Sequence, residues 1–279
     1  MNDKAGGFRG LRLVLLFLSF PVFLALLSGP ASAQIPTDSA KPMALVIGNA
    51  KYKKPNFDPL NTALNDAKDF AETLRGLGFV VEHFENIGKE QLTTVLKTFA
   101  DKAKLAPIRV VYFAGHGVQY RGKNYLIPVN EDISDTSDLK LKAPDVTYLL
   151  KQLGALEDGI NIVILDACRN NPLITPADRK GADVVLHGSA PISSPKGTLV
   201  AFPTAAGMPS LDSTEASVDQ EHSPYMSQLL RYIKEPGLPV ELMFKLVRNG
   251  VLEVTAGVQE PWESTSLRGN FCFAGGCPK

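Results

Sequence analysis

One short stretch constrains the fold of this chain more than any other: an aliphatic run that ends in an acidic residue and a thiol. Ile162–Leu165 are all aliphatic, and Asp166, Ala167, Cys168 and Arg169 follow at once. A run that is apolar at every position is typical of a parallel strand buried on both faces. Open α/β sheets bind their ligands at the edge formed by the carboxyl ends of such strands. The stretch therefore predicts that Cys168 lies at a ligand-binding edge.

Cys168 itself has two interpretations. A free cysteine is commonly a small buried hydrophobe. Here, however, Asp166, Arg169, Asn170 and Asn171 flank the thiol. A packed core does not accommodate such polar side chains without partners. We therefore interpret Cys168 as a nucleophile.

A thiol with an ordinary pKa of about 8.5 needs a base to react at neutral pH. His116 has the right setting, because it follows a second predicted buried strand, Ile108–Phe113, and stands between Gly115 and Gly117. The glycines allow a sharp turn, and the N–H of Gly117 has no side chain to shield it from an oxyanion. The separation from Cys168, 168 − 116 = 52 residues, is enough for a crossover to an adjacent parallel strand. The alternative is a structural histidine that caps a strand.

Alternating patterns along the chain predict the remaining elements. Besides the runs before His116 and Cys168, we expect strands at 43–47, 79–84, 125–129 and 197–202, and helices at 61–75, 89–104, 145–153, 223–234 and 239–252. Such strand–helix alternation implies a mostly parallel sheet with helices on both faces.

Several short motifs, in one order, resemble the caspase-like cysteine peptidases, most closely the bacterial caspase homologues related to metacaspases. They are residues 44–49 (ALVIGN), Tyr52, 64–67 (LNDA), 112–117 (YFAGHG), 124–129 (NYLIPV), 165–169 (LDACR) and 261–264 (PWES). A histidine roughly 50 residues before the cysteine is itself typical of caspases. The resemblance implies a caspase-like three-layer α/β sandwich, with a mostly parallel central sheet. It also implies a dyad of His116 and Cys168 that hydrolyses peptide bonds.

The resemblance also implies a substrate pocket. In metacaspase-like enzymes, acidic residues at the positions of Asp66 and Asp166 line the pocket for the residue before the scissile bond. Two carboxylates there favour Arg or Lys, and the forked guanidinium of Arg fits them better. The alternatives are an acidic residue favoured by a helix N-terminus for Asp66, and a strand-end carboxylate bound to backbone for Asp166.

Metacaspases often require calcium, but Glu131, Asp132, Asp135 and Asp138 do not map onto a calcium site. We expect a solvated acidic loop there, and neither a metal nor another cofactor. The 29 basic residues balance 29 acidic ones, which gives no electrostatic reason to expect nucleic acid or an anionic membrane as partner. The expected partner is a peptide or protein substrate, and the oligomeric state is left open.

The start of the chain is typical of an export signal. Basic residues precede the apolar segment Leu13–Leu27, and 31–33 (ASA) resembles a cleavage site. The apolar segment is short for a membrane span, which takes about 20 residues. We expect a signal peptide at 1–33, a linker at 34–41 and one caspase-like domain at 42–279, in the periplasm or secreted. The alternative is an uncleaved N-terminal membrane anchor.

Two further features, the C-terminal cysteines and the loop 170–196, matter if the chain is an exported peptidase. Cys272 and Cys277 flank two glycines and would meet in a disulfide, which leaves Cys168 free, although both can also be unpaired. The loop 170–196 offers Arg179-Lys180 as a site for maturation cleavage, and an uncut surface loop is the alternative.

The function expected from these features is a cysteine endopeptidase that cleaves after Arg or Lys. A catalytically silent caspase-like module that binds peptides or partners is the alternative from another class. A different thiol hydrolase, or a transpeptidase on the same scaffold, is the third.

Overall fold

A computed structural model describes residues 40–52, 56–156, 158–167, 173, 194–205, 210–212 and 221–278. The strands in it are β1 (Met43–Gly48), β2 (Val80–Glu85), β3 (Ile108–Gly115), β4 (Gly117–Tyr120), β5 (Lys123–Leu126), β6 (Ile160–Ala167), β7 (Thr198–Phe202) and β8 (Trp262–Thr265). The helices are α1 (Ala63–Gly76), α2 (Lys89–Lys102), α3 (Thr136–Lys142), α4 (Thr147–Gly154), α5 (Pro224–Tyr232) and α6 (Val240–Val254).

Six of the strands form one sheet in the order β2-β1-β3-β6-β7-β8. Neighbouring strands from β2 to β7 pair in parallel, and only β8 runs antiparallel, beside β7. Strands β4 and β5 form a separate antiparallel hairpin. The carboxyl ends of the two central strands, β3 and β6, therefore meet at the same edge of the sheet, as the sequence predicted.

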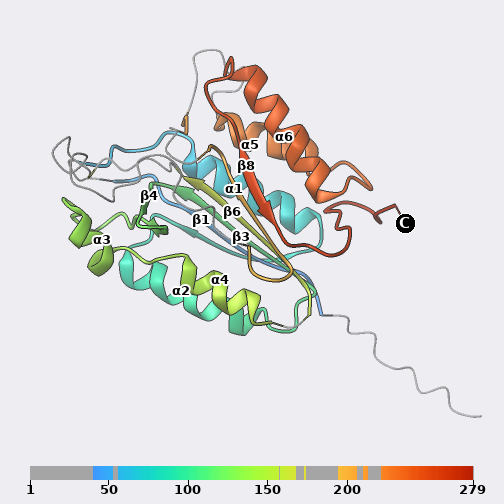
Figure 1. Ribbon diagram of the computed structural model, residues 1–279, viewed down its shortest axis with the longest axis horizontal. Coiled ribbons are helices and arrows are strands. Elements are labelled where there is room, and N and C mark those ends of the chain that lie inside the picture. Colours follow the sequence, from blue (N-terminus) through green and yellow to red (C-terminus); the bar gives the residue numbers. More distant parts are fainter. Residues whose placement is uncertain are drawn as a thin grey trace, which may run out of the picture. The chain divides into compact units, whose positions relative to one another are not determined.

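Helices cover both faces of the sheet, with α1, α5 and α6 on one side and α2 and α4 on the other (Figure 1). Alternation along β1 shows why both faces are apolar. Ala44 and Val46 belong to the core under the first group of helices, and Leu45 and Ile47 to the core under the second. Successive side chains of a strand point to opposite faces, so a run without polar residues supplies both cores. The predicted three-layer sandwich is confirmed.

The sequence prediction missed β4, α3 and β8, which are only four, seven and four residues long. It also placed a strand at 125–129, whereas β5 ends at Leu126. The strand cannot continue in the ladder through Pro128, because proline has no N–H to donate.

A buried arginine fixes the relative position of β3 and β6. Arg109, near the start of β3, donates from Nε to the carbonyl of Ala103 at 2.8 Å and from Nη1 to the carbonyl of Asp158 at 2.9 Å. Nη1 also lies 3.3 Å from Oδ1 of Asn161, which is its register partner on β6. With this end fixed, the same register pairs Gly115 with Ala167 at the other end.

The C-terminal cysteines are paired: Cys272 and Cys277 form a disulfide, with their Cα atoms 5.4 Å apart. The pairing favoured by the sequence is therefore present. Among the described helices, none is both long enough and apolar enough to cross a membrane. The predicted signal peptide, most of the linker, Arg179 and Lys180 lie outside the described residues.

Candidate active site

A small pocket, of about 40 Å³, lies where β3 and β6 end. His116, which directly follows β3, lines it together with Asp66 from α1 and Asp166 from β6. Thr62, Ser210, Asp212 and Ser223 also contribute polar groups to its lining. The structure thus brings together three of the residues singled out in the sequence. Cys168, the residue after the last residue of β6, lies outside the described residues.

Aromatic groups and one hydroxyl hold His116. The backbone N–H of His116 donates to the Tyr52 hydroxyl at 3.0 Å, and that hydroxyl donates to the carbonyl of Ile127 at 3.1 Å. The imidazole packs against the ring of Tyr52, at 4.6 Å between centroids, and against Phe57, at 5.2 Å. Burial raises the pKa of Tyr52, so its hydroxyl keeps its proton. Gly115 is required here, because its φ is +157° and a Cβ would lie 2.7 Å from the Tyr52 hydroxyl.

The hydrogen bond of the imidazole decides which nitrogen is basic. Nε2 of His116 lies 2.7 Å from the backbone carbonyl of Asp58, and a carbonyl only accepts. Nε2 therefore carries the proton, and in the neutral ring Nδ1 keeps its lone pair. Burial lowers the pKa of His116, although Asp58 acts in the opposite direction. The lowered pKa favours the neutral ring at pH 7. This is the form that a general base needs.

Asp66 is buried, although it belongs to the first turn of α1. Its Oδ1 lies 2.9 Å from Nδ1 of His222 and accepts from the N–H of Ser223 at 3.2 Å. Thr62 Oγ1 donates to Oδ2 at 3.3 Å. Burial raises the pKa of Asp66, and the bonds from His222 and Ser223 act in the opposite direction. These partners lie at the start of α5, so Asp66 does more than satisfy the N-terminus of its own helix.

Among the described residues, the hydrogen-bond partners of the Asp166 side chain are hydroxyl groups. Its Oδ2 accepts from the Tyr112 hydroxyl at 3.0 Å and from Ser223 Oγ at 3.3 Å. Burial raises the pKa of Asp166 to about 8, and the neighbouring charge of Asp66 acts in the same direction. This pKa favours the protonated form of Asp166 at neutral pH.

Two residues of the site have no signal in the sequence. Asp212 reaches the N-terminus of α1, where its carboxylate accepts from the N–H groups of Asn61, at 2.6 Å, and Thr62, at 3.2 Å. His222 lies between two carboxylates, with Nδ1 2.9 Å from Asp66 and Nε2 3.2 Å from Asp69. Only the doubly protonated imidazolium donates to both at once.

The remaining predicted positions lie elsewhere. Gly117 is buried in β4, opposite Leu126, and is not among the described residues that line the pocket. In the acidic loop, Asp135 caps α3 by accepting from Ser137 and Asp138, and Asp138 pairs with Lys142 at 2.6 Å. These carboxylates have protein partners. Within the described part of the chain, no group of three or more His, Cys, Asp or Glu residues is arranged to hold a metal ion.

Comparisons with known proteins agree with this fold. The family model described as "Caspase domain" matches residues 41–272. The human mucosa-associated lymphoid tissue lymphoma translocation protein 1 is 26% identical over 127 residues, which are 46% of this chain and 15% of the human protein. Its mouse homologue matches equally, so the chain spans a small part of both relatives. The crystal structure of caspase-1 from Spodoptera frugiperda superposes with a TM-score of 0.62 at 18% identity, over 85% of this chain and 91% of that one.

Proposed function

The chain belongs to the caspase domain family of cysteine peptidases, and from this premise we propose that it is an endopeptidase that cleaves after Arg and, less well, after Lys. The observation that carries the proposal is the group of carboxylates, Asp66, Asp166 and Asp212, in one pocket beside His116. A pocket lined by three acidic residues favours a cationic side chain, which stabilises their carboxylate forms, over an acidic one.

The proposed reaction uses His116 as the base and Cys168 as the nucleophile. Nδ1 of His116, left basic by the bond from Nε2 to Asp58, takes the proton of the Cys168 thiol. The thiolate attacks the peptide carbonyl, and the N–H groups of Gly117 and Cys168 hold the oxyanion. The C–N bond breaks as His116 gives its proton to the leaving amine. Water, deprotonated by the same base, then hydrolyses the thioester.

The specificity follows from the charge in the pocket. Asp66 already faces His222, whereas Asp166 has only the hydroxyls of Tyr112 and Ser223 as described hydrogen-bond partners. A guanidinium that enters beside Asp166 favours its carboxylate form and donates to both carboxylate oxygens in a forked contact. A substrate Lys offers only a point charge, and the carboxylates of the pocket repel a substrate Asp. The proposed order for the residue before the scissile bond is therefore Arg, then Lys, with Asp uncut.

Matched fluorogenic peptides that differ only in Arg, Lys, Ala or Asp before the scissile bond test this proposal. The parent chain should hydrolyse the Arg peptide fastest, and the Cys168→Ala and His116→Ala variants should lose turnover while keeping the parent circular dichroism spectrum. Labelling with iodoacetamide should reach Cys168 first, since the thiolate is the reactive form. A parent that prefers the Asp peptide, or a His116→Ala variant with parent rates, would refute the proposal.

A further inference from the structure

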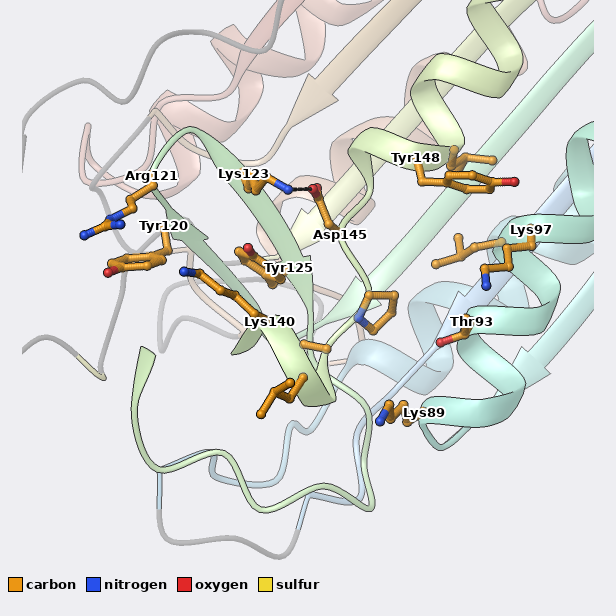
Figure 2. Close-up of a pocket in the computed structure, with 15 residues that line it drawn as sticks. Lys89, Thr93, Lys97, Tyr120, Arg121, Lys123, Tyr125, Lys140, Asp145 and Tyr148 are labelled. Carbon is orange, nitrogen blue, oxygen red and sulfur yellow. Dashed lines mark ion pairs between the residues drawn. The ribbon is translucent and has the colours of Figure 1, made fainter. Parts of the chain in front are cut away.

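A second and larger pocket, of about 640 Å³, lies apart from the His116 pocket and shares none of its lining residues. Its walls come from α2, from the end of α3, from α4, from the β4–β5 hairpin and from the segment between α3 and α4 (Figure 2). We call it the basic pocket; it is lined by Lys89, Thr93, Leu96, Lys97, Tyr120, Arg121, Lys123, Tyr125, Lys140, Leu141, Ala143, Pro144, Asp145, Tyr148 and Leu149.

The lining of the basic pocket carries an excess of positive charge. Five cationic side chains face a single carboxylate, that of Asp145, which Lys123 already pairs at 3.0 Å. The other four cations, Lys89, Lys97, Arg121 and Lys140, form no ion pair with a described residue. Figure 2 shows Lys89 and Lys97 on one side of the pocket and Arg121 and Lys140 on the other. The chain as a whole carries no net charge, so this excess is local.

The same pocket exposes apolar surface. Leu141 is 70% exposed and Tyr148 is 48% exposed, both on its rim. Buried Leu96, Ala143 and Leu149 lie behind them. Cationic side chains around apolar walls do not suit a small inorganic anion, which makes no use of the apolar part. The volume falls within the range of roughly 300–1,000 Å³ that is usual for ligand sites.

We propose that the basic pocket binds an acidic peptide segment of another protein. Carboxylates of the segment contact the four unpaired cations, and a leucine or phenylalanine between them packs on Leu141 and Tyr148. A nucleic acid suits the site less well, because its phosphates need an extended basic surface, and its affinity comes mainly from those phosphates. The proposal does not depend on peptidase activity, since the two pockets have no lining residue in common.

Fluorescence anisotropy tests the proposal with a short labelled peptide in which Glu alternates with Leu and Phe. The parent chain should bind it saturably, and the charge reversals Lys97→Glu and Lys140→Glu together should weaken binding about tenfold. The matched control reverses Lys68 and Lys245, which are exposed on α1 and α6 over the other face of the sheet. This control makes the same change in net charge and should leave the affinity unchanged, and thermal unfolding verifies that all variants fold.

A second pair of substitutions tests the apolar part. Leu141→Ala together with Tyr148→Ala should weaken binding of the Glu/Leu/Phe peptide severalfold, because the apolar contacts are lost, and should not affect an oligoglutamate of equal charge. Equal weakening by both charge-reversal pairs would overturn the proposal, since only the net charge would then matter. Binding of oligoglutamate or of a DNA duplex as tightly as the peptide would also overturn it, as would no saturable binding to the parent.

Discussion

At the scale of single residues, the burial of Asp166 connects pH with substrate binding. Burial raises the pKa of Asp166 to about 8, which favours the protonated side chain at neutral pH. A bound guanidinium favours the carboxylate, and binding therefore releases a proton below that pH. Affinity for Arg peptides must then increase as the pH rises towards about 8 and level off above it.

We expect the KM of Arg peptides to fall between about pH 6 and pH 8, while the pH dependence of kcat follows the lowered pKa of His116. Asp166→Asn should make the KM of Arg peptides nearly independent of pH over this range. It should also lower kcat/KM, mostly through KM, by a factor equivalent to roughly 2–4 kcal/mol. Alkylation of Cys168 by a small reagent serves as the control and should keep its parent rate. A parent KM that is constant over this pH range would contradict the assignment of Asp166 to the substrate pocket.

His222 contributes at the same scale, to stability. Its Nδ1 faces the buried carboxylate of Asp66, whereas Nε2 faces Asp69, whose side chain is 41% exposed. His222→Ala leaves Asp66 buried without this partner, and we expect a loss of about 3–5 kcal/mol in the free energy of unfolding. Asp69→Asn removes only the charge of the more exposed partner and should cost less than about 1 kcal/mol. Urea unfolding of both variants measures the difference, and equal losses would show that the buried contact is not the important one.

At the scale of helices and strands, the elements that could be predicted from the sequence are mostly those with a regular pattern of apolar residues. The amphipathic helix α1 and the apolar strand β6 were predictable because each has one repeating pattern over many residues. The short β4 and β8 have too few residues to show one.

Of the residues that line the His116 pocket, His116 and Asp166 stand out in the sequence because each lies at or just after the end of an apolar strand. Asp58 contributes only a backbone carbonyl, which any residue supplies. Asp212 and His222 contact α1 across 150 and 156 residues of sequence, respectively, and no local pattern encodes such a contact.

The contact between Arg109 and the turn before β6 gives a prediction about the sheet. Gly159 has φ +101°, and a Cβ there would lie 2.8 Å from Arg109 Nη1 and from the carbonyl of Pro107. Gly159→Ala should therefore lower the free energy of unfolding by about 1–3 kcal/mol. Gly76→Ala is the matched control, because nothing lies within 4 Å of its added Cβ. A Gly159→Ala variant as stable as this control would refute the role given to the turn.

At the scale of the whole molecule, the zero net charge of the sequence is distributed unevenly between two pockets. Asp66, Asp166 and Asp212 line the His116 pocket, and four cations that form no ion pair with a described residue line the basic pocket. Charges are screened beyond about 8 Å at physiological ionic strength, so each cluster acts on its own ligand. The zero net charge gave no electrostatic reason to expect nucleic acid or an anionic membrane as partner, but it does not exclude a local site for an acidic segment.

The last prediction concerns the compartment in which the chain works. We propose that it is exported and that cleavage after Ala33 leaves Gln34 as the mature N-terminus. The Cys272–Cys277 disulfide is consistent with this, because disulfides persist in oxidising compartments.

N-terminal sequencing of the protein from periplasm or medium should begin at Gln34. Peptide mapping without reductant should find Cys272 joined to Cys277 and Cys168 as a free thiol. Ala33→Leu should block cleavage, because the signal requires a small residue there, and should leave the chain attached to the membrane. A parent chain recovered from the cytosol that still begins at Met1, with reduced Cys272 and Cys277, would rule out export.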